Sequence, residues 1–132
     1  MASILRFEEI ISWKEARILN GTIGKLIDDN RLDRNYRLIS QIEGSSGSIM
    51  DNIAEGFGRG SRKEFVNCLS IAKGSAEESR SQLYRCLDNG LTDEKLFVSL
   101  INQLDILVRK TGSLIHYLNS VSTKGQKFKD RF

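Results

Sequence analysis

Proline is absent from the 132 residues of this chain, and histidine and tryptophan occur once each. The lack of proline disfavours proline-punctuated β-sandwiches and Pro-rich linkers, and it suits long uninterrupted helices. No apolar run approaches the roughly 20 residues that a bilayer span requires. The first residues lack a basic segment followed by a long apolar stretch, and acidic residues begin at Glu8, so they do not have the pattern of a secretory signal. We therefore expect one cytoplasmic domain without a membrane segment.

Cysteine is also scarce, and the two that occur, Cys68 and Cys86, are expected on one helix. Their separation along a helix is about 27 Å at 1.5 Å per residue, too far for a disulfide or for shared metal binding. With His116 as the only histidine, neither a zinc set nor the Glu-x-x-His pairs of di-iron bundles can be assembled. We predict no metal, no cofactor and no enzyme activity. A buried carboxylate cluster of Glu55, Glu64 and Glu78 would be the exception.

Charge is unevenly placed although the net charge is only +3. Residues 124–132 hold four of the 20 Lys and Arg but one of the 17 Asp and Glu, which gives +3. The other 123 residues therefore hold 16 positive and 16 negative charges. We divide the chain into a balanced domain over 1–123 and a basic C-terminal tail over 124–132.

Apolar residues recur at steps of three and four in four segments, which predicts four amphipathic helices. The segments run from Phe7 to Asp29, from Asp33 to Phe57, from Ser61 to Asn89 and from Thr92 to Val121. Helices of this length joined by short loops must run antiparallel to their neighbours. The sequence thus predicts an all-α, up-down-up-down four-helix bundle. The expected seam positions are Ile39, Ile42, Ser46, Ile49, Ile53 and Gly56; Phe65, Leu69, Ala72, Ala76, Ser79, Leu83 and Cys86; and Leu100, Leu104, Leu107, Thr111, Leu114, Leu118 and Val121.

Capping signals mark the predicted helix ends. Asp33 and Thr92 are expected N-caps, and Ser61 with Glu64 fits a capping box. Asn89 and Gly90 suit a left-handed C-terminal cap.

Two stretches of small residues, 44–48 and 74–76, lie inside the second and third predicted helices. Small side chains allow two backbones to approach, so we interpret them as a close helix crossing; a kinked or frayed patch is the alternative. The glycine-rich stretch 56–61 follows a helix and lacks the Gly-Lys-Ser/Thr ending of a P-loop. We interpret it as a turn in which glycines adopt positive φ.

The topology would gather basic residues at one end of the bundle. The turn between the second and third helices shares that end with both chain termini, and Phe128 and Phe132 could stack on unpaired bases. Such a basic pole could grip a phosphate backbone, although a tail kept for solubility is the alternative. The candidate contacts are Arg6, Arg59, Arg62, Lys63, Lys124, Lys127, Lys129 and Arg131.

The stretch Asn-Ile-Ala-Glu-Gly at 52–56, followed by Gly-Ser-x-x-Glu at 60–64 and Lys-Gly-Ser-Ala-Glu-Glu at 73–78, resembles the 23S rRNA intervening-sequence protein family of bacterial four-helix bundles. The family motif residues are Asn52, Glu55, Gly56, Glu64, Gly74, Ser75 and Glu78. The resemblance implies a closed four-helix bundle, a ring-like homopentamer and no enzyme activity. A similar bundle serves as the accessory protein of diversity-generating retroelements, which implies nucleic-acid binding.

This chain departs from the family pattern at two places. Glu43 and Gly44 stand where paired basic residues are common, and Met50 stands where proline is common. These departures remove positive charge from the middle of the bundle and favour the basic pole as the contact. We expect the motif residues to be structural, with Glu55 pairing with Arg59 one turn on.

The sequence therefore predicts a non-enzymatic, oligomeric bundle that binds nucleic acid, RNA more than DNA, through its basic pole. The alternative is a protein-interaction adaptor, for example an accessory partner of a reverse transcriptase. An exposed face bearing Trp13, Phe97 and Tyr117 would favour the adaptor.

Overall fold

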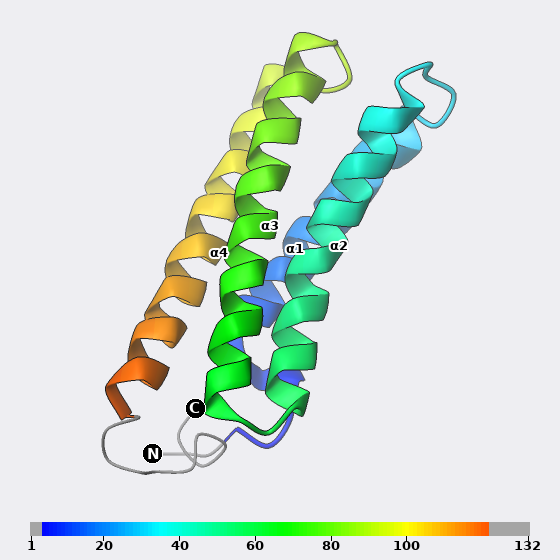
Figure 1. Cartoon of the computed structure of the whole chain (residues 1–132). Coiled ribbons are helices and arrows are strands. Elements are labelled where there is room, and N and C mark those ends of the chain that lie inside the picture. Colours follow the sequence, from blue (N-terminus) through cyan, green and yellow to red (C-terminus); the bar gives the residue numbers. More distant parts are fainter. Residues whose placement is uncertain (1–3, 122–132) are drawn as a thin grey trace.

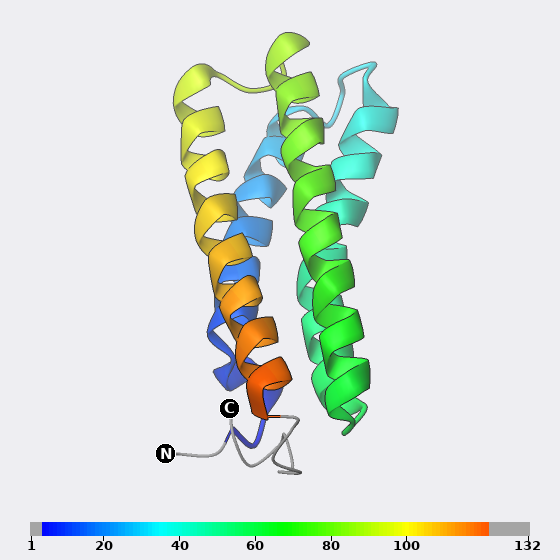
Figure 2. The ribbon, with the colours of Figure 1, turned by 60° about the vertical axis from the view of Figure 1, so that its left-hand side comes forward.

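The computed structural model describes residues 4–121, and in this part of the chain there are four long helices, one short 3-10 helix and no strand. The long helices lie side by side, each antiparallel to the one before it (Figures 1 and 2). Helices adjacent in sequence pack together, and the last closes against the first. The predicted up-down-up-down four-helix bundle is confirmed. The elements are η1 (Phe7–Glu9), α1 (Ile11–Asp29), α2 (Tyr36–Gly58), α3 (Arg62–Asp88) and α4 (Glu94–Val121).

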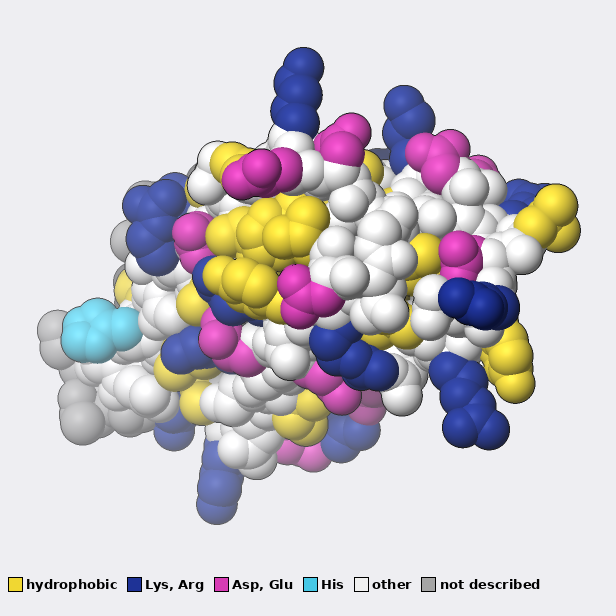
Figure 3. Space-filling view, turned by 90° about the horizontal axis from the view of Figure 1, so that it is seen from above, with side chains coloured by type: hydrophobic (Ala, Val, Ile, Leu, Met, Phe, Trp, Pro, Cys, Tyr) yellow, Lys and Arg dark blue, Asp and Glu magenta, His cyan; other side chains and the backbone are white. Residues whose placement is uncertain are grey.

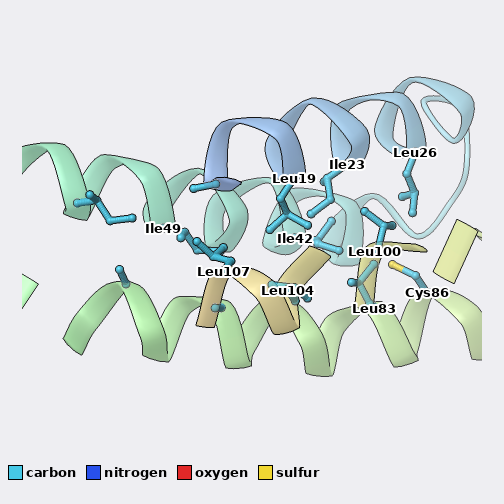
Figure 4. Packing of buried hydrophobic residues seen from close by; sticks show 14 of the residues in the cluster. Leu19, Ile23, Leu26, Ile42, Ile49, Leu83, Cys86, Leu100, Leu104 and Leu107 are labelled. Carbon is cyan, nitrogen blue, oxygen red and sulfur yellow. The ribbon is translucent and has the colours of Figure 1, made fainter. Parts of the chain in front are cut away.

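The core is a continuous seam of aliphatic side chains from all four long helices (Figure 4). Each fully buried leucine or isoleucine contributes roughly 1.5–3 kcal/mol of hydrophobic stabilisation. Most predicted seam positions are buried, but Ile39, Leu114 and Val121 are only half-buried. Leu38 and Phe97 are buried although neither belongs to the predicted seam.

The predicted first helix is interrupted. Phe7–Glu9 form η1, Ile10 is extended with φ −72° and ψ 124°, and α1 begins only at Ile11. The break lets Ile10 bury its side chain and lets Phe7 pack edge-on against Trp13, with ring centroids 5.1 Å apart.

Two predicted N-caps are wrong. Asp33 lies in the loop, where its Oδ1 accepts hydrogen bonds from the backbone N and side-chain Nδ2 of Asn35 at 2.8 and 2.9 Å. That local turn delays α2 to Tyr36. At α4 the cap is Asp93 instead of Thr92, because Asp93 Oδ1 accepts from the backbone N of Leu96 at 2.7 Å.

Both ends of α3 follow their predicted signals. Ser61 caps the helix by accepting from the backbone N of Glu64 at 3.4 Å, although the Glu64 side chain interacts with Arg59 instead of completing the box. At the other end Gly90 has φ +74°, and the backbone N of Leu91 donates to the Cys86 carbonyl at 2.9 Å, as in a Schellman motif.

The interpretation of the small-residue stretches is partly wrong. Helices α2 and α3 do pack together, but a Cβ on Gly44, Gly47 or Gly74 would meet nothing within 4 Å. Serines make the contacts instead: Ser48 Oγ lies 3.0 Å from Ser75 Oγ near the middle of the helices, and Ser45 and Ser79 meet about one turn further from the α2–α3 turn. The crossing is therefore polar, and its glycines leave open space at the surface.

The close approach that requires glycine is at Gly56. A Cβ there would lie 2.6 Å from Cys68 Cβ and 3.0 Å from Phe65 Cδ1. Of the glycines in the stretch 56–61, only Gly60 has a positive φ, of 74°. Gly56 and Gly58 belong to α2, so the turn is shorter than predicted.

Replacing Gly56 by alanine should destabilise the bundle by about 1–3 kcal/mol, because the new methyl group overlaps Cys68 on the facing helix. Urea denaturation measures the change. The matched control is Gly112→Ala in α4, where an added Cβ meets nothing and alanine is the better helix former. A Gly56→Ala protein as stable as the control would contradict the proposed close packing.

Candidate functional site

The basic pole is predicted at the end of the bundle where α2 turns into α3. The described chain begins near η1 and ends with α4 at this same end (Figure 1). Four of the predicted contacts, Arg6, Arg59, Arg62 and Lys63, belong to these segments. The other four, Lys124, Lys127, Lys129 and Arg131, and the predicted tail 124–132 lie outside the described residues.

Arg59 is held by two carboxylates. Its Nε donates to Glu55 Oε2 at 3.2 Å, its Nη2 pairs with the same oxygen, and its Nη1 is 3.4 Å from Glu64 Oε1. The hydrogen bond and charge of Glu55, followed by Glu64, raise the pKa of Arg59. The arginine thus links the end of α2 to the start of α3, and most of its charge is compensated locally.

Arg62 and Lys63 are the cations that remain available at this pole. Both lie in the first turn of α3, and neither forms an ion pair within residues 4–121. Arg6, by contrast, pairs with Glu8 at 3.5 Å. The described part of the pole therefore has two cations free to meet an external anion.

The opposite end has no patch of one sign. Seen from the α1–α2 and α3–α4 loops, basic and acidic side chains are interspersed around a group of hydrophobic side chains (Figure 3). Arg31 in the first of these loops pairs with Asp28.

Several family motif residues have structural contacts. Asn52 Nδ2 donates to the backbone O and Oγ of Ser48 at 2.8 and 2.9 Å, and Ser48 meets Ser75 on α3. The expected Glu55–Arg59 pair is present. These residues join α2 to α3 and fix their register.

Gly74 and Glu78 make no such contacts between α2 and α3. Both are exposed, a Cβ on Gly74 would meet nothing, and Glu78 makes no hydrogen bond or ion pair within the described residues. The carboxylates of Glu55, Glu64 and Glu78 are all exposed, so the buried acidic cluster that would indicate an enzyme is not formed.

Glu78 borders a polar cavity of about 480 Å³ on the outer face of α2 and α3, which we call the α2–α3 groove. Ser45 forms its floor, donating to Gln82 Oε1 at 2.6 Å and lying 2.8 Å from Ser79 Oγ. Arg85 Nη1 donates to Gln41 Oε1 at 3.0 Å at one end. The groove is lined by Gln41, Ser45, Glu78, Ser81, Gln82 and Arg85.

Sequence reasoning missed this groove, although a signal for it exists. Gln41, Ser45, Ser48 and Asn52 follow one another at steps of four, three and four, which places polar groups on one stripe of α2. The stripe adjoins the hydrophobic seam, and only the position of α3 shows that it lines a surface hollow.

The aromatic residues that would have favoured an adaptor do not form an exposed face. Phe97 is buried and packs edge-on against Tyr84 with centroids 4.9 Å apart. Trp13 and Tyr117 are half-buried against the core.

Neither catalysis nor metal binding has a visible centre among residues 4–121. His116 is exposed, and no group of three or more His, Cys, Asp or Glu in this part of the chain could hold a metal ion. None of the helices described is both long and apolar enough to cross a membrane. Burial raises the pKa of the Cys68 and Cys86 thiols.

Both thiols should react with Ellman's reagent far more slowly in the folded protein than in urea at about pH 8, because burial covers the sulfur and a raised pKa lowers the thiolate fraction. Cys86→Ala, which leaves one thiol, assigns the rates. Equal rates in the folded and unfolded protein would contradict this packing.

The model of the family described as 23S rRNA-intervening sequence protein matches residues 8–113. No curated protein matches. A crystal structure of a protein of unknown function from the S23 ribosomal protein family of Bacteroides thetaiotaomicron is similar in fold, with a TM-score of 0.74 and 23% identity over 80% of this chain and 98% of that chain. Because the family model covers most of the chain, including α2, α3 and the groove between them, this protein belongs to the 23S rRNA-intervening sequence protein family.

Proposed function

We propose that the protein is a non-enzymatic, oligomeric bundle that binds structured RNA through phosphate contacts at the pole formed by the α2–α3 turn. The supporting observation is that Arg62 and Lys63 stand without an ion pair in the described structure at the end from which the chain continues into its basic last residues. The helix ends described at this pole lie at the same end of the bundle, so they can contribute to one phosphate-binding surface.

The contacts divide into two classes. Arg62 and Lys63 bind phosphate directly, together with the basic residues of 124–132. Arg59 holds the turn through Glu55 and Glu64, so it positions its neighbours instead of contacting RNA. The name of the family, which refers to 23S rRNA, supports RNA over DNA as the ligand.

Assembly supplies the affinity that one chain lacks. Two cations and a short basic segment bind phosphates weakly at physiological salt. A ring, with the pentamer as the favoured size, would present one pole from each copy on the same rim, and linking several weak sites strengthens binding without any new chemistry. The cytoplasm is the proposed location.

Fluorescence anisotropy with structured RNA, single-stranded RNA and duplex DNA over a salt series tests this function. The full chain should bind structured RNA most tightly, with affinity that falls steeply with salt. Arg62→Ala/Lys63→Ala should lower the salt slope by about 1 for each phosphate that is no longer neutralised, and a chain ending at Ser122 should bind more weakly still.

The matched control removes the same charge at the other end of the bundle. Arg34 and Arg37 are exposed and form no ion pair within the described chain, so Arg34→Ala/Arg37→Ala should leave binding unchanged. Loss of binding in this control equal to that of Arg62→Ala/Lys63→Ala would refute the pole as the contact. An absence of binding at low salt would refute nucleic-acid binding and favour a protein adaptor.

A further inference from the structure

Helix α1 carries an apolar ridge that no part of the described chain covers. Ile11 and Ile18, the first and eighth residues of α1, are 57% and 56% exposed. Lys14, Gly21 and Lys25 share their face, because steps of three, four and seven residues bring side chains to one side of a helix. We call these five residues the α1 ridge.

A cavity of about 490 Å³ adjoins this ridge, lined by residues of η1 and α1. Trp13 forms one side, with the Arg17 guanidinium carbon 5.9 Å from its ring centroid. The ridge and this hollow together make a surface on which a second helix pair can pack, with Lys14 between the two isoleucines and Lys25 two turns beyond Ile18.

The α2–α3 groove and the surface beside it carry two unpaired carboxylates. Glu78 lines the groove and Asp51 lies outside its lining on α2, and neither forms an ion pair in the described chain. The one cation of the lining, Arg85, lies at one end of the groove, where it donates to Gln41. Gly44 and Gly74 lie beside the groove on α2 and α3, exposed and with open space where a side chain would be. Ile71, 54% exposed, lies on the same outward stripe of α3 as Gly74 and Glu78.

We propose that the α1 ridge of one copy of this chain docks in the α2–α3 groove of the next. Lys14 and Lys25 then face the carboxylates of Asp51 and Glu78. The isoleucines of the ridge are covered where the glycines beside the groove let the backbones approach. The same contact explains glycines inside helices that lower helix stability and that nothing within one chain requires. This inference rests on the oligomeric part of the proposed function and names its contact surfaces.

Ridge and groove lie on different sides of the bundle. The neighbouring Thr22 turns toward α4, where Gln103 Nε2 donates to its Oγ1 at 3.5 Å, whereas the groove lies between α2 and α3. Each copy therefore uses its ridge on one neighbour and its groove on another. Such a head-to-tail contact closes into a ring when the rotation between copies permits.

The test measures the mass of the full chain in solution, without nucleic acid, by light scattering and sedimentation. The wild type should have a multiple of 14.9 kDa. Gly74→Leu should be a 14.9 kDa monomer whose melting temperature, compared with the wild type diluted to a monomer, is unchanged or higher, because the new side chain projects from the face that the ridge would cover but clashes with nothing in its own chain. Ser113→Leu, on an exposed part of α4 away from both the ridge and the groove, is the matched control and should assemble normally.

Charge reversal identifies the two faces. Lys14→Glu/Lys25→Glu and Asp51→Lys/Glu78→Lys should each shift assembly to at least tenfold higher concentration, and the chain with all four changes should recover it. Lys95→Glu/Arg109→Glu, which reverses two exposed cations of α4, should have no effect.

The outcomes separate this inference from the proposed function. An assembled wild type whose mass is unaffected by Gly74→Leu, or a fourfold variant that does not recover, overturns the ridge-and-groove contact and leaves RNA binding standing. A wild type that is monomeric at tens of micromolar overturns this contact and oligomerisation together. An assembled wild type that binds no RNA overturns only the proposed function.

Discussion

The contact between α2 and α3 is the interaction on which the rest of the structure depends. At one end Gly56 brings the two backbones together against Cys68, at a distance that no side chain could occupy. Toward the other end serine hydroxyls replace aliphatic packing, with Ser45 bonded to Ser79 and Gln82. Buried hydroxyls must be paired to avoid a desolvation cost, so these bonds fix one register of α2 against α3. Aliphatic side chains alone would tolerate slippage.

That register also determines the electrostatics of the pole. A short turn with Gly60 at positive φ brings Glu55 and Glu64 to either side of Arg59. The Arg59 guanidinium is paired within the turn. The basic residues left to bind a ligand are therefore the next two along α3. A count of basic residues in the sequence thus overstates the number of unpaired cations at the folded pole, because ion pairing depends on which helix ends meet.

The architecture could be predicted from periodicity, because steps of three and four define a helical seam whichever partner it faces. Ser61, Asn89 and Gly90 were informative for the same reason, since their effects are local. The break at Ile10 could not be predicted, because an extended residue there gains only from tertiary burial. Asp33 and Thr92 were wrong because neighbouring side chains, Asn35 and Asp93, compete for the same backbone groups. The α2–α3 groove was missed because a polar stripe has meaning only once the helix beside it is known.

The family motif reconciles these observations. Part of it, at Asn52, Glu55 and Gly56, has contacts within the chain, while Gly74 and Glu78 have none within the described structure and face outward. In the proposed assembly, the motif residues that have no contact within their own chain lie on the face that meets the next copy. A bundle whose 123-residue body is electrically neutral gains little affinity for phosphate as a monomer. Assembly through uncharged glycines and a few ion pairs would leave the poles free, so that RNA binding depends on the number of copies instead of the charge of each.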